Sequence, residues 1–252
     1  MAQAETIVRL REHWRHLETG NWRAAAAEFA PDCRYMYPPT RPGDDAINGR
    51  EDLVDYFRNI GDADVDRMID HTVVEGDSAV VFGRATGSGV DGVRLFGVYL
   101  TAGDDGIEYY SRVNREEGSD YTLPGSETDA DATTNRSPIE ILQQYWHYLE
   151  TDKFEAAAEE FAEDVKYLHP PVIEGVTDVV GRQTLFEYFS EVRGPRDITH
   201  TIERKVVDGN TAGVLGVATG DDINGIHVYV CYVEAQDDEI RYYSTCNRDV
   251  AV

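Results

Sequence analysis

The sequence predicts an α+β protein made of two tandem copies of one unit. The first observation is an internal repeat: "HWRHLETGNWRAAAAEFAPDCRYMYPP", which begins at His13, aligns without gaps on "YWHYLETDKFEAAAEEFAEDVKYLHPP", which begins at Tyr145. The second is the periodicity within each copy, because helical spacing of apolar residues comes first and strand-like runs follow. The third is a set of turn signals, such as "DGN" and "AGDDG", that divide those runs into hairpins. Helices followed by an antiparallel meander indicate the α+β class.

The repeat also sets the predicted domain boundaries. Trp14 pairs with Trp146 at an offset of 132 residues, and one inserted residue before "VVDGN" makes the later offset 133. We therefore expect domain 1 at residues 1–116 and domain 2 at 138–252. Residues 117–137 are polar, acidic and without apolar periodicity, which predicts a flexible linker.

Each copy predicts three helices and a short strand before the meander. The first helix shows apolar residues at helical spacing, and a short alanine-rich helix follows as "WRAAAAEFA" or "FEAAAEEFA". A brief strand then runs into a Pro-Pro dipeptide, and the third helix begins at "GREDLVDYF" or "GRQTLFEYF". The apolar positions of the first helix are Ile7, Leu10, Trp14 and Leu17 in one copy and Ile139, Leu142, Trp146 and Leu149 in the other.

One strand of the second copy predicts how the copies associate. In "IHVYVCYV", residues 226–233, both alternating sets of side chains are apolar, whereas a strand covered on one face alternates polar and apolar residues. Both faces are therefore expected to be buried, one by the helices of the unit and the other by a second sheet. The other copy is the natural candidate, so domain 1 is predicted to pack on domain 2 as an internal pseudo-dimer. A higher oligomer stays open.

The charge of the chain restricts its partners. With 48 acidic and 23 basic residues, the formal net charge is −25. Nucleic acids and anionic membranes need basic patches, so neither is expected as a partner. The chain holds only three lysines, and an acidic, lysine-poor composition is typical of halophilic proteins, which remain soluble in salt that screens repulsion. An acidic mesophilic protein is the alternative.

The sequence predicts a cytoplasmic protein. Its start, "MAQAETIVRLREHW", becomes amphipathic at once and lacks the apolar core of a secretory signal. No apolar run reaches the length that spans a bilayer. The three cysteines have no metal-binding spacing, and their odd number suits a reducing compartment.

The ordered set of motifs resembles the NTF2-like superfamily. It comprises a helix, a short helix, F-A-x-D-x-x-Y-x-x-P, a G-R helix and four strands, and it occurs twice. The SnoaL-like and ketosteroid-isomerase-like branches are the most similar in pattern. The resemblance implies a cone-shaped curved sheet wrapped around the helices, with a small-molecule pocket in each domain. It does not fix a function, because enzymes and binding modules share this fold.

The resemblance also suggests site residues. In ketosteroid isomerases the general base lies just before the proline that follows the second helix, and Tyr37 and His169 hold that position here. The donor tyrosine lies four residues before a leucine of the first helix, which is the position of His13 and Tyr145. The Tyr/His pair is thus exchanged between the copies, which predicts that the two positions touch. Such a pair suits acid–base chemistry, and a hydrogen bond between two buried polar groups is the structural alternative.

These residues lead to three hypotheses on function. The first is isomerase-, cyclase- or dehydratase-type chemistry on a small, largely apolar carbonyl compound, catalysed by His169, Tyr145, His13 and Tyr37. The second is a ligand-binding module without turnover, and the third is a structural or interaction protein whose cones are filled. Expected ligand-binding residues are Trp14, Tyr35, Trp146, Tyr167, Arg94, His227, Asn114 and Asn247.

No cofactor and no metal are expected. "GSGVDG", residues 87–92, fits a dinucleotide motif but is followed by a strand rather than a helix. His13 and His16 are one helical turn apart, yet their counterparts Tyr145 and Tyr148 are poor metal ligands. "DADVD", residues 62–66, lacks the glycine and glutamate that complete a calcium loop.

Overall fold

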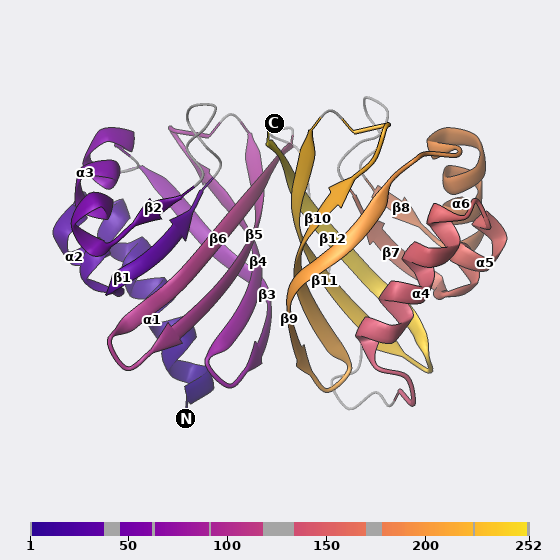
Figure 1. Ribbon diagram of the computed structural model, residues 1–252, viewed down its shortest axis with the longest axis horizontal. Helices are drawn as coiled ribbons and strands as arrows, with labels where there is room; N and C mark the ends of the chain where they lie inside the picture. Colours follow the sequence, from indigo (N-terminus) through magenta and orange to yellow (C-terminus); the bar gives the residue numbers. More distant parts are fainter. Residues whose placement is uncertain are drawn as a thin grey trace. The chain divides into compact units, whose positions relative to one another are not determined.

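The computed structural model describes residues 2–37, 46–61, 64–90, 92–117, 134–169, 178–223 and 225–250. The chain divides into two compact units, Met1–Tyr121 and Thr122–Val252. Each unit is a six-stranded sheet with helices, so the predicted α+β class and tandem repeat are confirmed (Figure 1). Both Pro-Pro dipeptides and residues 118–133 of the predicted linker lie outside the described residues.

The first unit follows the predicted order of elements. Its elements are α1 (Ala2–Glu18), α2 (Trp22–Ala27), β1 (Phe29–Met36), β2 (Ile47–Asn48), α3 (Arg50–Ile60), β3 (Val65–Glu75), β4 (Ser78–Gly87), β5 (Val93–Gly103) and β6 (Gly106–Glu117).

The second unit repeats this order with one change, a π-helical segment, η1, that continues its third helix. Its elements are α4 (Pro138–Glu150), α5 (Phe154–Glu159), β7 (Phe161–Leu168), β8 (Asp178–Val180), α6 (Arg182–Glu187), η1 (Tyr188–Arg193), β9 (Thr199–Asp208), β10 (Thr211–Thr219), β11 (Ile226–Gln236) and β12 (Glu239–Val250).

The two sheets share one strand order, and each contains a parallel pair. The order is β2-β1-β6-β5-β4-β3 in the first unit and β8-β7-β12-β11-β10-β9 in the second. The last four strands form the predicted antiparallel meander. However, β1 pairs with β6, and β7 with β12, in parallel, so each curved sheet is mixed rather than antiparallel throughout. The third helix of the unit and the strands that follow it lie between the two paired strands and provide the crossover that a parallel pair requires.

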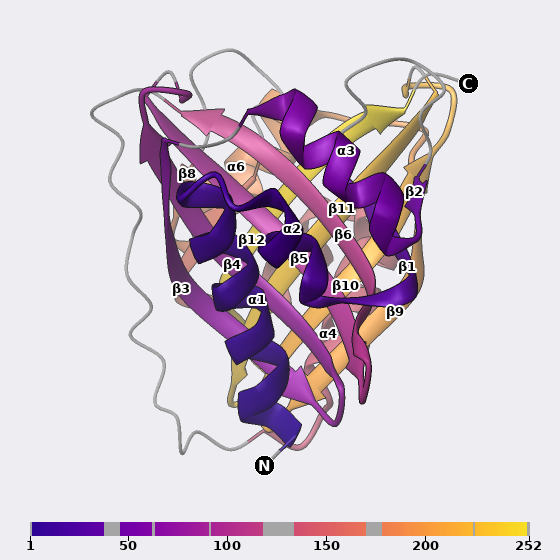
Figure 2. The same ribbon diagram turned by 90° about the vertical axis from the view of Figure 1, so that its left-hand side faces the viewer.

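The helices of each unit lie on one face of its own sheet. Figure 2 shows α1, α2 and α3 across the sheet of the first unit. Leu10, Trp14 and Leu17 are buried, as the helical spacing predicted, and pack with the inward residues of the strands. The corresponding stripe of α4 is likewise part of the core of the second unit.

A glycine helps the sheet of the second unit to bend. The register of β9 against β10 shifts between Leu215 and Gly216, and such a bulge bends a strand. A Cβ on Gly216 would lie 2.5 Å from the Thr201 carbonyl oxygen and from the Tyr229 ring. Only glycine therefore fits at the bend, where it lets Tyr229 pack against β10.

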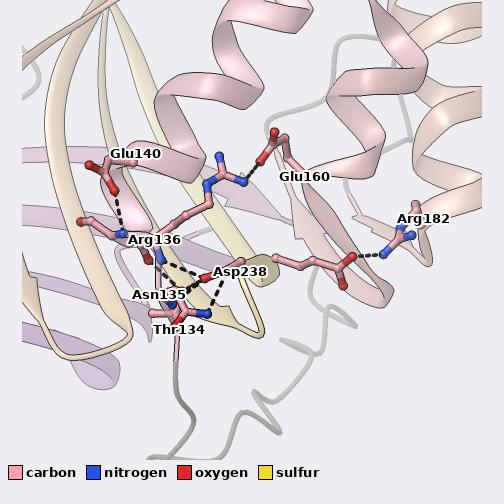
Figure 3. A network of polar contacts seen from close by, with 9 residues as sticks. Thr134, Asn135, Arg136, Glu140, Glu160, Arg182 and Asp238 are labelled. Atoms are coloured by element: carbon pink, nitrogen blue, oxygen red, sulfur yellow. Dashed lines mark hydrogen bonds and ion pairs between the residues drawn. The ribbon is translucent and has the colours of Figure 1, made fainter.

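Asp238 ties the start of the second unit to its last hairpin (Figure 3). Its carboxylate accepts hydrogen bonds from the Thr134 hydroxyl at 2.8 Å and from the backbone N–H groups of Asn135 and Arg136 at 2.6 and 2.8 Å. These bonds, that of the Arg136 N–H first, hold the pKa of Asp238 well below its usual range. Arg136 continues the network to Glu160 at 2.8 Å.

We expect Asp238→Asn to destabilise the second unit at neutral pH. Because the pKa is lowered in the folded state, the stabilisation is present above the unfolded-state pKa of about 3.9 and is lost as the pH falls. Urea denaturation should show a lower midpoint for the variant at neutral pH and a shrinking difference in acid. Asp105→Asn, at the equivalent hairpin position of the first unit, is the control. An equal loss of stability in the two variants would contradict the role of the network.

Candidate functional site

A cavity of about 210 Å³ lies in the second unit. It spans the sheet from the end of β7 to the start of β9 and is bordered by α4, η1 and the segment after η1. This resolves which set of side chains on the last strand faces inward, since Tyr243, Thr245 and Asn247 point into the cavity. The aromatic and basic side chains that line it include Tyr145, Tyr167, His169, Arg193, Arg196, His200, His227 and Tyr229.

A stack of three rings forms one wall. The parallel pairing of β7 with β12 places Tyr167 opposite Tyr243, and their rings lie 4.7 Å apart at 8°. His169 follows on the same side of the chain and stacks on Tyr167 at 5.7 Å and 4°. The first unit has the equivalent stack, formed by Tyr110, Tyr35 and Tyr37.

Two tyrosine hydroxyls meet beside this stack. The hydroxyl oxygens of Tyr145 and Tyr167 are 2.9 Å apart. Burial raises the pKa of both phenols, so both stay protonated. One hydroxyl donates its proton to the other, and the second proton is then free to donate to a ligand oxygen.

Tyr145 and His169, which their exchange predicted to touch, both contact Tyr167. Tyr167 connects the two positions through its hydrogen bond to Tyr145 and its stacked contact with His169. The first unit shows the same arrangement, since Tyr35 contacts both His13 and Tyr37. The sequence analysis named the shared tyrosine, Tyr35 or Tyr167, as a ligand-binding residue but did not predict that it links the two positions.

His13 is a core residue of the first unit. Its imidazole is fully buried between Phe29 and Phe57, with ring centroids at 4.8 and 5.2 Å. Nδ1 lies 3.1 Å from the Ala25 carbonyl oxygen, so it carries the proton and donates. Burial lowers the pKa of His13 to about 3. The neutral ring therefore serves packing in the core.

His200 and Glu150 form a pair that the sequence analysis missed. The His200 Nδ1 is 2.9 Å from a Glu150 carboxylate oxygen, which also accepts the backbone N–H of His200 at 2.7 Å. The ring stacks on Trp146 at 5.0 Å and 7°. Burial raises the pKa of Glu150, but the hydrogen bonds from His200 outweigh it and the net pKa is lowered. A carboxylate at Nδ1 favours the tautomer whose Nε2 carries a lone pair.

Two arginines reach the cavity from η1 and the segment after it. Arg193 is the last residue of η1, before Gly194 with φ 64°. Gly194 corresponds to Gly61, which ends α3 in the first unit with φ 63°. A π-helical turn is wider than an α-helical one and is frequent at functional sites. Arg196 follows, and its Nε donates to the Arg193 carbonyl at 3.3 Å.

Of the eight predicted ligand-binding residues, four lie at the cavity of the second unit and four lie in the first unit. Tyr167, His227 and Asn247 line the cavity, and Trp146 packs behind His200. Arg94 instead forms an ion pair with Glu116. The remaining predicted residues belong to the first unit: Trp14 and Tyr35 are buried in its core, and Asn114 bonds Arg112.

The first unit carries an arginine where the second has its cavity. Arg112, the counterpart of Thr245, is buried, and its guanidinium lies 5.3 Å from the Tyr37 ring and 4.7 Å from the Phe96 ring. These rings are the counterparts of His169 and Tyr229, two walls of the cavity. The Arg112 Nε donates to the Asn114 side chain at 2.9 Å, which holds it in place. Arg112 therefore fills the space between these rings.

Comparison with known families identifies both units. The sequence profile of the SnoaL-like domain matches residues 10–118 and 142–246. The chain belongs to the SnoaL-like domain family. Its tandem organisation is thus confirmed, since each unit matches the domain separately. None of the curated proteins searched by sequence matches this SnoaL-like chain.

Solved structures similar to this SnoaL-like chain cover one unit at a time. A protein assigned as a ketosteroid isomerase from Kribbella flavida is 24% identical, with 44% of this chain and 76% of that chain covered and a TM-score of 0.36. A protein assigned as a SnoaL-like polyketide cyclase from Jannaschia sp. is 21% identical, with 45% and 85% covered and a TM-score of 0.37. An LEH-like epoxide hydrolase from M. tuberculosis is 13% identical, with 44% and 82% covered and a TM-score of 0.37.

The described residues contain neither a candidate membrane-spanning helix nor a candidate metal-binding cluster. No helix within them is both long and apolar enough to cross a membrane. No group of three or more His, Cys, Asp and Glu side chains among them is arranged to hold a metal ion.

We expect the His13 imidazole to stay neutral from about pH 8 to pH 4. In NMR spectra its ring-proton signals, assigned by their loss in His13→Tyr, should not shift over this range. The unfolded chain protonates His13 near pH 6.5, so the unfolding free energy should fall below that pH by up to about 1.4 kcal/mol per unit. A titration midpoint near pH 6.5 in the folded protein would contradict its burial.

Proposed function

We propose that the second unit catalyses proton transfer on a small carbonyl compound bound in its cavity. The observation that supports this most strongly is the His200–Glu150 pair. A histidine oriented by a carboxylate at one nitrogen, with the other available, is a recurring form of general base. Its position on the wall of the same cavity as the Tyr145–Tyr167 hydroxyl pair brings a base and a donor to one ligand.

The proposed reaction moves a proton between two carbon atoms. His200 Nε2 accepts the proton from a carbon next to the carbonyl group. The tyrosine hydroxyl whose proton is not used within the pair donates a hydrogen bond to the carbonyl oxygen as negative charge develops there. His200 then returns the proton to the far carbon of a neighbouring C=C bond; the carbonyl group re-forms and the double bond moves next to it, which completes an isomerisation without net uptake of protons. His169, the base suggested by family resemblance, is a second imidazole on the cavity wall and is proposed to assist the return.

We propose that the first unit has a structural rather than a catalytic role. Arg112 occupies the space between the rings that correspond to cavity walls, and His13 is held neutral in the core. Tyr37 accepts a long hydrogen bond from Asn114 at 3.5 Å, within the same filled region. This proposal replaces the expectation of one functional pocket per domain.

The internal pseudo-dimer also remains a proposal. Strand alternation supports it: Val81 and Val98 belong to the core under the helices, so Phe82 and Leu95 project from the opposite face of the sheet. Leu215 and Val230 are placed in the same way in the second unit. A monomer in molar salt, measured by light scattering, is the result that this packing predicts.

We also propose that the protein is located in the cytoplasm. Cys33, Cys231 and Cys246 are all buried and form no disulfide, which supports a reducing, cytoplasmic location. A salt-rich cytoplasm would screen the net charge of −25.

Deuterium exchange tests the proposed chemistry. Small ketones are incubated with the protein in D₂O and molar salt, and loss of the proton next to the carbonyl is followed by NMR. We expect His200→Gln to lower the exchange rate by about 10²–10⁴-fold, and Tyr145→Phe by a smaller factor. His147→Gln, an exposed histidine on α4, is the matched control.

The same assay distinguishes an enzyme from a binding module. If the wild-type protein binds ketones but accelerates no exchange, the cavity is a binding site without turnover. If exchange is fast and unaffected by His200→Gln, His200 is not the base.

A further inference from the structure

The cavity of the second unit has a charge opposite to that of the chain. The formal net charge of the protein is −25, yet two arginines line this one cavity. Isolated guanidinium groups are costly to bury, so a buried arginine normally has an anionic partner. The positive charges of Arg193 and Arg196 therefore require a negatively charged partner.

Arg193 is 9% exposed, and its one hydrogen bond among the described residues runs from Nη1 to the Gly194 carbonyl at 3.0 Å. Its guanidinium is close enough to Tyr145 and Tyr188 to lower their pKa values against the rise that burial causes. Most of its N–H groups are therefore left beside the hydroxyl pair without an acceptor from the described part of the chain.

Arg196 is similar but less buried. Its Nε donates to a backbone carbonyl, and within residues 134–169, 178–223 and 225–250 neither arginine forms an ion pair with a carboxylate. Two carboxylates lie near the cavity. Glu150 is bound to His200, and Asp222 is exposed and accepts the Asp197 backbone N–H at 2.7 Å. Asp222 also lines the cavity, but within the described residues neither carboxylate pairs with Arg193 or Arg196.

The arginines of the first unit show the contrast. Arg67, at the position of His200, pairs with Glu18 at 3.4 Å, and Arg112 bonds Asn114 and covers two rings. Arginines that fill the cone of the first unit thus have partners from their own unit. Arg193 and Arg196 of the second unit face a cavity instead.

We infer that the cavity binds a small carboxylate, with Arg193 and Arg196 holding the carboxylate group. The planar guanidinium matches a carboxylate through two parallel hydrogen bonds. Leu149, Ile198, Ala218 and Ile223 provide apolar walls for the rest of the molecule. The inference rests on the proposed function. Together, the two proposals specify the substrate class as a keto acid with a short apolar body. It adds an anionic group to the largely apolar ligand that the sequence predicted.

Paired probes that differ only in charge test this inference. Phenylacetate and hexanoate are compared with phenylacetamide and hexanamide, which have nearly the same shape, by calorimetric titration of the full chain in molar salt. We expect each carboxylate to bind at least about tenfold more tightly than its amide. Arg193→Gln with Arg196→Gln should reduce this preference to less than about threefold. Arg58→Gln, an exposed arginine of α3 that pairs with Asp55, is the control and should leave it unchanged.

The outcomes separate this inference from the proposed function. The wild-type comparison needs no variant, so misfolding of a variant cannot hide the result. Binding of the amides as tightly as the carboxylates would overturn the inference and leave the proposed acid–base site standing. A carboxylate preference that survives in the double variant would also overturn it. If the carboxylates bind but no keto acid exchanges its proton, the inference stands and the proposed catalysis fails.

Discussion

The ring stack on the parallel strand pair is the feature on which the rest of each unit depends. Pairing of β7 with β12 sets Tyr243 against Tyr167, and His169 extends the stack. This stack fixes the Tyr167 hydroxyl against Tyr145 and gives the cavity a rigid wall. The first unit keeps the same stack, with centroids of Tyr35 and Tyr110 at 4.6 Å. One framework thus supports either a filled or a hollow interior.

A single position distinguishes the two interiors most clearly. Arg112 places a guanidinium between two rings in the first unit, whereas Thr245 leaves the corresponding space open in the second. Arginine stacks well on aromatic faces, so it substitutes for a ligand that the ring walls would otherwise hold. The replacement of Arg67 by His200 changes an ion pair into a histidine–glutamate pair. In the proposed division of roles, one copy serves stability and the other keeps a cavity.

The sequence predicted the fold well because the repeat doubled every signal. Helical spacing identified α1 and α4, and turn residues located the meander. These signals did not identify several residues of the site. His200 follows the inserted residue that shifts the alignment, and Arg193 depends on a π-helical turn with no signature in its residues. A contact between Tyr145 and His169 was predicted from their exchange, whereas the exchange did not single out Tyr167, which joins them by a hydrogen bond and a ring stack. A comparison of Arg112 with Thr245 would have shown that the interiors differ.

The most direct test of this division between the units is a crystal structure of Thr245→Arg in high salt. Asn247 is available to accept the Arg Nε, as Asn114 does in the first unit. The new side chain should lie between the rings of His169 and Tyr229, and the cavity should be filled without a change in the sheet. An arginine that turns to solvent and leaves the cavity open would contradict the account.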